Sequence, residues 1–225
     1  MSLELSIKLE LARPMRDRLN TGKCFGIKEM GMTDELLDRV RAFPNATLLE
    51  VGVAQAASAV KFLELENIAL YIGVDPWEWY EDSPDPEFNK GYLDRKMGLW
   101  VNQEKWDSVY KIAQDAVAPY GARARLIRAF SHDAIQQVDD TLDIVSIDGN
   151  HQYEYALYDI RVWYEKMRSG GMMLVDDVRF RGGPMIDNRW GGQEASEVER
   201  AVDDFTREIG VDYELVDNNA IIIKP

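Results

Sequence analysis

The chain has 225 residues, of which 46% are hydrophobic and 29% are charged, so it is long enough for one full-sized α/β domain of ordinary globular composition. Its formal net charge of −14 disfavours nucleic acid as a partner, because binding to a phosphate backbone relies on a positive surface. The single cysteine, Cys24, excludes an internal disulfide and a paired-cysteine metal site. The sequence shows neither a membrane-spanning apolar run nor the apolar core of a secretory signal, so we expect a cytoplasmic protein with no membrane partner.

Helices and strands alternate along the predicted secondary structure. Residues 1–32 are expected to form an N-terminal arm or helix, and Thr33 is placed to cap a helix that Pro44 stops. Beyond it, short apolar runs alternate with amphipathic segments, a pattern typical of strands buried on both faces between layers of helices. The predicted strands are TLLEVGV (47–53), ALYIGVD (69–75), ARLIRAF (124–130), LDIVSID (142–148) and GMMLVDD (171–177). The predicted helices lie near 56–66, 106–118, 132–138, 151–168 and 194–208.

Two glycines and two asparagines predict how the C-terminal part of the chain turns. We expect Gly170 and Gly171 to end the helix at 151–168, because glycine readily adopts the left-handed conformation that follows many helices. In the last segment, YELVDNNAIIIKP, two apolar runs flank Asn218 and Asn219, which favours a tight antiparallel hairpin. Since the chain contains no repeat, low-complexity tract or linker, the sequence predicts a single α/β domain over 1–225 with a doubly wound, mostly parallel sheet.

Polar residues directly follow most of these apolar strands. In a doubly wound sheet, ligands bind beyond the carboxyl ends of the strands, where the strand order reverses. Gly52 would allow a tight turn and close approach of the backbone to a ligand, and Asp75 is placed to accept hydrogen bonds from ribose hydroxyls. The alternatives are an ordinary strand–helix turn at Gly52, and a helix cap or a solvated turn residue at Asp75. The other polar positions at strand ends are Glu50, Ser131, His132, Asp148, Asn150, His151, Asp176 and Asp177.

Four segments resemble the class I S-adenosylmethionine-dependent methyltransferases: E-x-G-x-A-x-A-x-S (50–58), GVDPW (73–77), SIDGNHQYE (146–154) and SGGMMLVDD (169–177). Within that class they are similar to the macrocin O-methyltransferase type, which acts on sugars and other small molecules. The resemblance covers residues 33–225, with 76–105 unmatched in detail. It implies a three-layer Rossmann-like fold with a mostly parallel seven-stranded sheet and an antiparallel C-terminal hairpin. It also implies a cofactor site made by Glu50, Gly52, Ser58, Asp75, Ser131, His132 and Asp148.

The sequence departs from the family pattern at the glycine motif and at the position of a common general base. Ala54 and Ala56 stand where the motif usually has smaller residues, which narrows the space for the cofactor. Asn150 stands where many members have a second aspartate, and an amide cannot act as a base. We expect His151, with Asp148, to serve as the catalytic pair, because imidazole titrates near neutral pH. Alternatively, His151 is a structural residue at a helix start, and Asn150 is the N-cap of that helix.

Asp148, Asp176 and Asp177 match the carboxylates that hold a divalent cation in metal-dependent members of the family. Three carboxylates at the ends of neighbouring strands repel one another when unpaired, and a dication with oxygen ligands relieves this repulsion. Mg²⁺ is the expected ion, because it keeps water positions open for a substrate hydroxyl. The alternative is that these aspartates are exposed or pair with Arg179 and Arg181.

Two segments are candidates for covering the acceptor. The insertion 76–107 holds Trp77, Trp79, Trp100 and Trp106, which suits either a lid over a flat or sugar ring, or the core of a helical cap or dimer contact. The glycine-rich segment 178–192 would close the other side of the site.

These observations predict an S-adenosylmethionine-dependent O-methyltransferase acting on a small-molecule hydroxyl, assisted by a divalent cation and able to form a homo-oligomer. One alternative is a nicotinamide-dependent oxidoreductase, although VGVAQA lacks the glycine spacing of a dinucleotide fold. The other is a non-catalytic binding subunit whose site was altered at Ala56 and Asn150.

Overall fold

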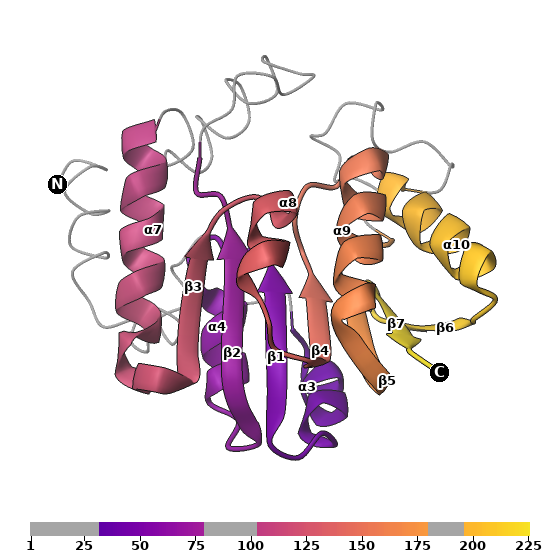
Figure 1. The fold of residues 1–225 in the computed structure, drawn as a ribbon, viewed down its shortest axis with the longest axis horizontal. Coiled ribbons are helices and arrows are strands. Elements are labelled where there is room, and N and C mark those ends of the chain that lie inside the picture. The colour runs from indigo at the N-terminus through magenta and orange to yellow at the C-terminus, as the bar shows by residue number, and fades with distance from the viewer. Residues whose placement is uncertain (1–31, 79–102, 180–195) are drawn as a thin grey trace, which may run out of the picture.

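A seven-stranded sheet forms the centre of the computed structural model, which describes residues 32–78, 103–179 and 196–225 (Figure 1). The N-terminal arm predicted for 1–32 therefore lies outside the described residues, except for Met32. From one edge to the other the strands are β3 (Ala124–Arg128), β2 (Ile68–Asp75), β1 (Ala46–Val51), β4 (Leu142–Ile147), β5 (Met167–Val175), β7 (Asn219–Ile223) and β6 (Tyr213–Val216).

The direction of the strands confirms the predicted mixed sheet. The β3–β2, β2–β1, β1–β4 and β4–β5 pairs are parallel, whereas β7 runs antiparallel to both β5 and β6. The strand order reverses between β1 and β4, where Gly52 follows β1 and Asp148 follows β4. Such a reversal opens a crevice at the carboxyl ends of the strands, and this is where doubly wound sheets bind ligands.

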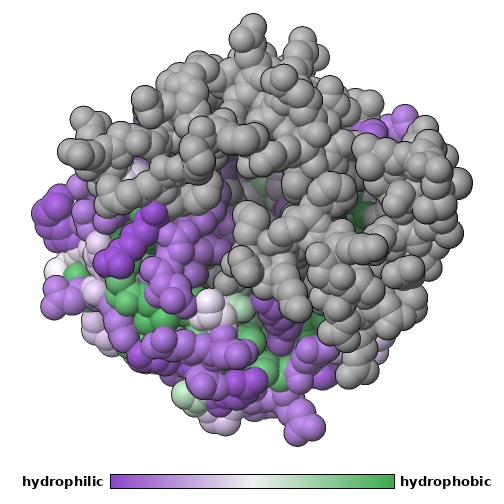
Figure 2. Space-filling view, turned by 180° about the vertical axis from the view of Figure 1, so that it is seen from behind, coloured by the Kyte–Doolittle hydropathy of each residue, from purple (hydrophilic) through white to green (hydrophobic). Residues whose placement is uncertain are grey.

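Helices cover both faces of the sheet and make three layers (Figure 1). One buried cluster packs α3 (Asp34–Arg41), α4 (Ala57–Leu63) and α7 (Gln103–Val117) against one face. A second packs α8 (Ser131–Ala134), α9 (Tyr153–Lys166) and α10 (Glu197–Ile209) against the other. Figure 2 shows the face opposite to that of Figure 1, where hydrophobic surface is visible between hydrophilic residues in the lower half. No helix in the described part of the chain is long and apolar enough to cross a membrane. The 3₁₀ turns of the described residues are η2 (Ala118–Arg123) and η3 (Ile135–Gln137).

The first described helix forms as its sequence predicts. The Oγ1 of Thr33 accepts a hydrogen bond from the Leu36 N–H at 3.4 Å, and two acidic residues occupy the first turn of α3. Both features stabilise the amino end of a helix, because they satisfy a free N–H group and complement the helix dipole. The apolar face of α3 then packs on the sheet, with Leu36 and Val40 fully buried.

The prediction that Gly170 and Gly171 end the long helix is wrong. Helix α9 ends at Lys166, and Met167 already has the extended conformation of β5. Both glycines lie within β5 and pair with the C-terminal end of the chain, since Gly170 N–H donates to Lys224 O at 2.7 Å. A Cβ at Gly171 would lie 3.0 Å from Asp143 O, so glycine here permits close packing on the neighbouring strand.

The C-terminal hairpin is confirmed, but its turn lies one residue earlier than predicted. Asp217 and Asn218 form the turn, Asn219 already belongs to β7, and the residue with a positive φ is Asp217 at 53°. Of the predicted covering segments, 79–102 and 180–195 lie outside the described residues, and with them Trp79 and Trp100. At the ends of the 76–107 insertion, Trp77 is fully buried and Trp106 is part of α7.

Candidate active site

The carboxyl ends of β1 and β4 meet at Gly52, as the strand order requires. Gly52 has a φ of +87°, and its N–H donates to Val74 O at 2.9 Å. A Cβ at this position would overlap the carbonyl of Asp148 and lie 2.9 Å from Gly149 N. Glycine is therefore required by backbone conformation and by space together. Because Gly52 has no side chain, the loop after β1 can lie directly beside the loop that carries Asp148.

The two alanines of the glycine motif keep the backbone conformation of glycine. Ala54 has a φ of 46°, and Ala56, which precedes α4, has φ 64° and ψ 34°. Residues with a Cβ adopt this left-handed region at a cost of about 1–2 kcal/mol each. The loop 52–56 thus keeps a turned backbone, although Ala54 and Ala56 each carry a methyl group.

Asp75 is buried and fixes the loop after β1. Its Oδ2 accepts a hydrogen bond from Ala54 N–H at 3.0 Å, and its Oδ1 accepts one from Trp77 N–H at 2.7 Å. Burial raises the pKa of Asp75, and these backbone hydrogen bonds oppose the rise. Each carboxylate oxygen has a second lone pair, so the side chain remains able to accept from ribose hydroxyls. Trp77 Nε1 also donates to Ala54 O at 2.9 Å, which ties the two loops together.

Glu50 lies beneath this loop and is held by two hydroxyl groups. Ser58 donates to Oε1 and Tyr71 donates to Oε2. Burial raises the pKa of Glu50 to about 8, the two hydroxyl hydrogen bonds lower it, and the charges of Asp148 and Asp75 raise it further. Tyr71 was not predicted as a site residue, because a tyrosine in an apolar strand usually belongs to the core.

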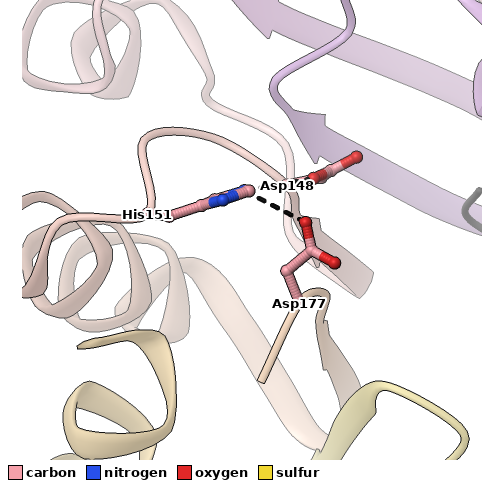
Figure 3. Close-up of side chains that lie close together, drawn as sticks. All are labelled: Asp148, His151 and Asp177. Carbon is pink, nitrogen blue, oxygen red and sulfur yellow. Dashed lines mark ion pairs between the residues drawn. The ribbon is translucent and has the colours of Figure 1, made fainter. Parts of the chain in front are cut away.

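Asp148, His151 and Asp177 come together at the ends of β4 and β5 (Figure 3). His151 Nε2 lies 3.8 Å from Asp148 Oδ1 and 3.5 Å from Asp177 Oδ2. One ligand atom from each of the three residues lies within 4.8 Å of the others, which is a set that could hold a metal ion. Burial alone would lower the pKa of His151, but the hydrogen bond to Asp148 and the charges of Asp177, Asp148 and Asp176 raise it overall.

Asp176 lies next to this cluster but is oriented by the backbone. Its Oδ1 accepts a hydrogen bond from Asp177 N–H at 2.8 Å. Burial, followed by the charges of Asp148 and Asp177, raises the pKa of Asp176 to about 7. Burial also raises the pKa of Asp177. Carboxyl groups that oppose one another's ionisation in this way fit a dication with oxygen and imidazole ligands.

The C-terminal hairpin orients Asp177, a contact that the sequence did not predict. Asn218 Nδ2 donates to Asp177 Oδ1 at 2.6 Å, and Asn218 O accepts from Val178 N–H at 3.0 Å. Asp177 itself has a φ of 56°, which turns the chain at the end of β5. Within the described part of the chain, the side chain of Asp177 therefore contacts His151 and Asn218, while Arg179 donates its N–H to Asn218 Oδ1. Arg181 lies outside the described residues.

Asn150 and Ser131 both have structural partners. Asn150 Oδ1 accepts from Gln152 N–H at 2.9 Å and shapes the turn before α9, whose N-cap is Gln152 rather than Asn150. Ser131 is buried and accepts from Trp163 Nε1 at 3.1 Å, and it hydrogen-bonds the buried carboxyl of Asp159.

His132, the neighbour of Ser131, points elsewhere. Its ring stacks on Phe130 with centroids 5.8 Å apart, and its Nε2 lies 3.3 Å from Asp133 Oδ2. With 60% of its side chain exposed, it lies at the surface and not with the Asp148 cluster.

Comparison with known proteins places the chain in a family. A family model described as a methyltransferase domain matches residues 49–178, which is more than half of the chain and contains all the site residues described above except Asn218. An uncharacterized protein, R132 of Acanthamoeba polyphaga mimivirus, is 33% identical over 166 residues. That match covers 72% of this chain and 61% of the viral protein, so the chain spans less than two thirds of its relative.

Solved structures share the fold at low sequence identity. A putative caffeoyl-CoA O-methyltransferase from Staphylococcus aureus is 15% identical, with 99% of this chain and 98% of that chain covered and a TM-score of 0.62. Cofactor-bound Rv0187 from MTB is 14% identical, with 93% and 88% covered and a TM-score of 0.61. An O-methyltransferase from Bacillus cereus in complex with SAH is 14% identical, with 93% and 90% covered and a TM-score of 0.55.

Proposed function

The chain belongs to the methyltransferase domain family, and from this premise we propose that it transfers the methyl group of S-adenosylmethionine to a hydroxyl oxygen of a small molecule. The observation that carries the proposal is the position of the Asp148–His151–Asp177 cluster beside the Gly52 turn, at the reversal of strand order. The loop that we propose for the cofactor and the cluster that we propose for the ion thus share one edge of the sheet. The putative caffeoyl-CoA O-methyltransferase of Staphylococcus aureus and the O-methyltransferase of Bacillus cereus, which have this fold, support the choice of oxygen as the acceptor atom.

The residues around the Gly52 turn fit the cofactor. Glu50 is a buried carboxyl at the position expected for the methionine end, and Asp75 is a buried acceptor at the position expected for the ribose. The turned loop between them exposes no side chain larger than a methyl group at positions 52, 54 and 56. S-adenosylmethionine would supply an electrophilic sulfonium methyl, and the protein has to place an acceptor oxygen in line with it.

The cluster at β4 and β5 fits a divalent cation, with Mg²⁺ as our proposed ion. Asp148, Asp177 and His151 would hold it, and Asp176 would complete the negative surroundings. A bound dication lowers the pKa of a hydroxyl group that it contacts, which is the chemistry that an O-methyltransferase needs. The acceptor class we propose is a sugar or another hydroxylated compound with vicinal hydroxyls, which present two oxygens to one ion.

His151 has two possible roles in this arrangement. It can hold the cation, or it can accept the proton of the acceptor hydroxyl, since its raised pKa makes it a good proton acceptor once it is deprotonated. In either role the neighbouring carboxylates hold the imidazole in place, at 3.5 Å from Asp177 and 3.8 Å from Asp148.

Calorimetric titration tests the cofactor. S-adenosylhomocysteine should bind saturably and NAD should not, and Asp75→Ala should weaken binding by about 1.5–3 kcal/mol, the contribution of hydrogen bonds to a charged group. Asp115→Ala removes an exposed carboxylate of α7 and is the matched control, for which we expect unchanged affinity. Saturable NAD binding without a response to S-adenosylhomocysteine would replace this proposal with an oxidoreductase.

Transfer of a labelled methyl group to a panel of sugars and vicinal diols tests the cation and the base. Chelation by EDTA should abolish transfer and leave S-adenosylhomocysteine binding intact, and Asp148→Ala should behave in the same way without rescue by added Mg²⁺. His151→Ala should lower turnover about 10²–10⁴-fold if the histidine is the general base. Full activity in excess EDTA would remove the cation from the reaction. If the protein binds the cofactor but methylates nothing, the non-catalytic alternative gains support.

A further inference from the structure

Tyr71 contacts the proposed cofactor site from inside the core. Its side chain is fully buried, and its Oη donates a hydrogen bond to Oε2 of Glu50, which is itself 1% exposed. Ser58 at the start of α4 donates to the other carboxylate oxygen, Oε1. The two oxygens of Glu50 are thus each held by one hydroxyl group, one from the neighbouring strand and one from the helix above.

The register of β1 and β2 explains how Tyr71 reaches this carboxyl. Glu50 lies directly opposite Gly73, and Tyr71 lies two residues earlier on the same face of the sheet. A Cβ at Gly73 would lie 3.0 Å from the Tyr71 Oη and 2.9 Å from Val53 Cγ2. Gly73 therefore leaves the space through which the tyrosine hydroxyl approaches Glu50.

The surroundings of Glu50 favour a cation that arrives with a ligand. The charged groups that act on it are Asp148 and Asp75, which are both anionic, and its hydrogen-bond donors are neutral hydroxyls. Burial raises the pKa of Glu50 to about 8, and the hydrogen bonds from Ser58 and Tyr71 oppose that rise. A buried carboxylate is costly unless a positive group compensates it, and none of these neighbours is positive.

We propose that Tyr71 is a positioning residue for the α-amino group of the cofactor, because its hydroxyl, with that of Ser58, orients the Glu50 carboxylate toward the incoming ammonium. This inference rests on the proposed function. Each oxygen of Glu50 accepts one internal hydrogen bond and keeps a second lone pair for the ligand. Tyr71 does not itself contact the cofactor in this arrangement.

Two ligands that differ at the amino acid part separate this role from general support of the fold. S-adenosylhomocysteine carries the ammonium, whereas 5′-methylthioadenosine lacks the whole amino acid part. Tyr71→Phe should weaken S-adenosylhomocysteine about tenfold, the effect of one hydrogen bond to a charged group, and leave 5′-methylthioadenosine unchanged. Ser58→Ala should show the same selective loss. The matched control is Tyr213→Phe, which removes another tyrosine–carboxylate hydrogen bond, from Tyr213 in the C-terminal hairpin to Asp203 in α10, and should change neither affinity.

The pH dependence of binding gives a second readout. Affinity for S-adenosylhomocysteine should rise as Glu50 loses its proton near pH 8, and the midpoint should move to higher pH in Tyr71→Phe, because the variant loses a hydrogen bond that stabilises the charged form. Equal losses for both ligands, or an unchanged affinity for S-adenosylhomocysteine, would overturn the role of Tyr71 alone. Failure of the wild-type protein to bind S-adenosylhomocysteine would overturn the proposed function itself.

Discussion

The left-handed alanine at position 54 allows a sharp test of the loop after β1. Ala54→Gly would release the strain of a φ of 46°, which is worth about 1–2 kcal/mol. Two smaller effects oppose this gain. Glycine gives the unfolded chain more conformational entropy, which lowers the free energy of unfolding by about 0.4–1 kcal/mol. Loss of a half-buried methyl group removes about half of the ~0.8 kcal/mol that full burial provides. We therefore expect the free energy of unfolding to stay unchanged or to rise by up to about 1 kcal/mol.

The matched comparison is Ala59→Gly in the interior of α4. Ala59 is fully buried and helical, so the substitution releases no strain, loses a whole methyl group and lowers helix propensity. These losses sum to about 1.5–2 kcal/mol. Urea denaturation of both variants, with m-values equal to that of the wild type, measures the difference directly. If Ala54→Gly destabilises the protein as much as Ala59→Gly does, Ala54 is not strained and the loop does not have the turned conformation.

Three other substitutions test particular contacts of the site. Gly52→Ala should lower the free energy of unfolding by at least ~3 kcal/mol in a urea titration, because the added Cβ would sit on a residue with positive φ and overlap the Asp148 carbonyl. A smaller loss would mean that the loops after β1 and β4 are not in contact. Burial raises the pKa of Asp159 to about 6, so the contribution of this carboxyl to wild-type stability should be fully present below about pH 4, where the unfolded carboxyl is also protonated, and should be lost as pH rises through 6. Asp159→Asn should flatten that dependence, and an unchanged pH profile would show that this carboxyl is already solvated in the folded protein. Asn218→Ala should weaken Mg²⁺ binding about 10–100-fold in calorimetry and leave S-adenosylhomocysteine affinity unchanged, because the Asn218 amide orients Asp177. Equal effects on both ligands would make Asn218 a general structural residue.

The element types and the glycine turn after β1 were predictable from local pattern. Strands buried on both faces have continuous apolar runs, and the polar residue after each run marks its carboxyl end. For that reason Glu50, Gly52, Asp75 and Asp148 could be named from the sequence alone. The family resemblance assigned the same positions to a cofactor, and the family match confirms the methyltransferase domain that contains them.

The details that depend on packing across the sheet were not predictable. Gly170 and Gly171 were assigned to a helix stop, because a glycine pair indicates a turn whether or not a neighbouring strand approaches it closely. Tyr71 was left in the core, because only the register of β1 and β2 shows that its hydroxyl reaches Glu50 across the space left by Gly73.

The composition of the candidate ion site also depended on tertiary structure. Three aspartates were predicted from the sequence, whereas the described residues bring Asp148 and Asp177 together with His151, and place Asn218 behind them. A strand end determines which residues lie near the edge of the sheet. The backbone turn after each strand, such as the positive φ of Asp177, determines which of those side chains face one another. Local sequence determines where each strand ends, because strand ends follow from hydrophobic periodicity. Only the folded chain determines which side chains face one another, because this depends on contacts between segments far apart in sequence.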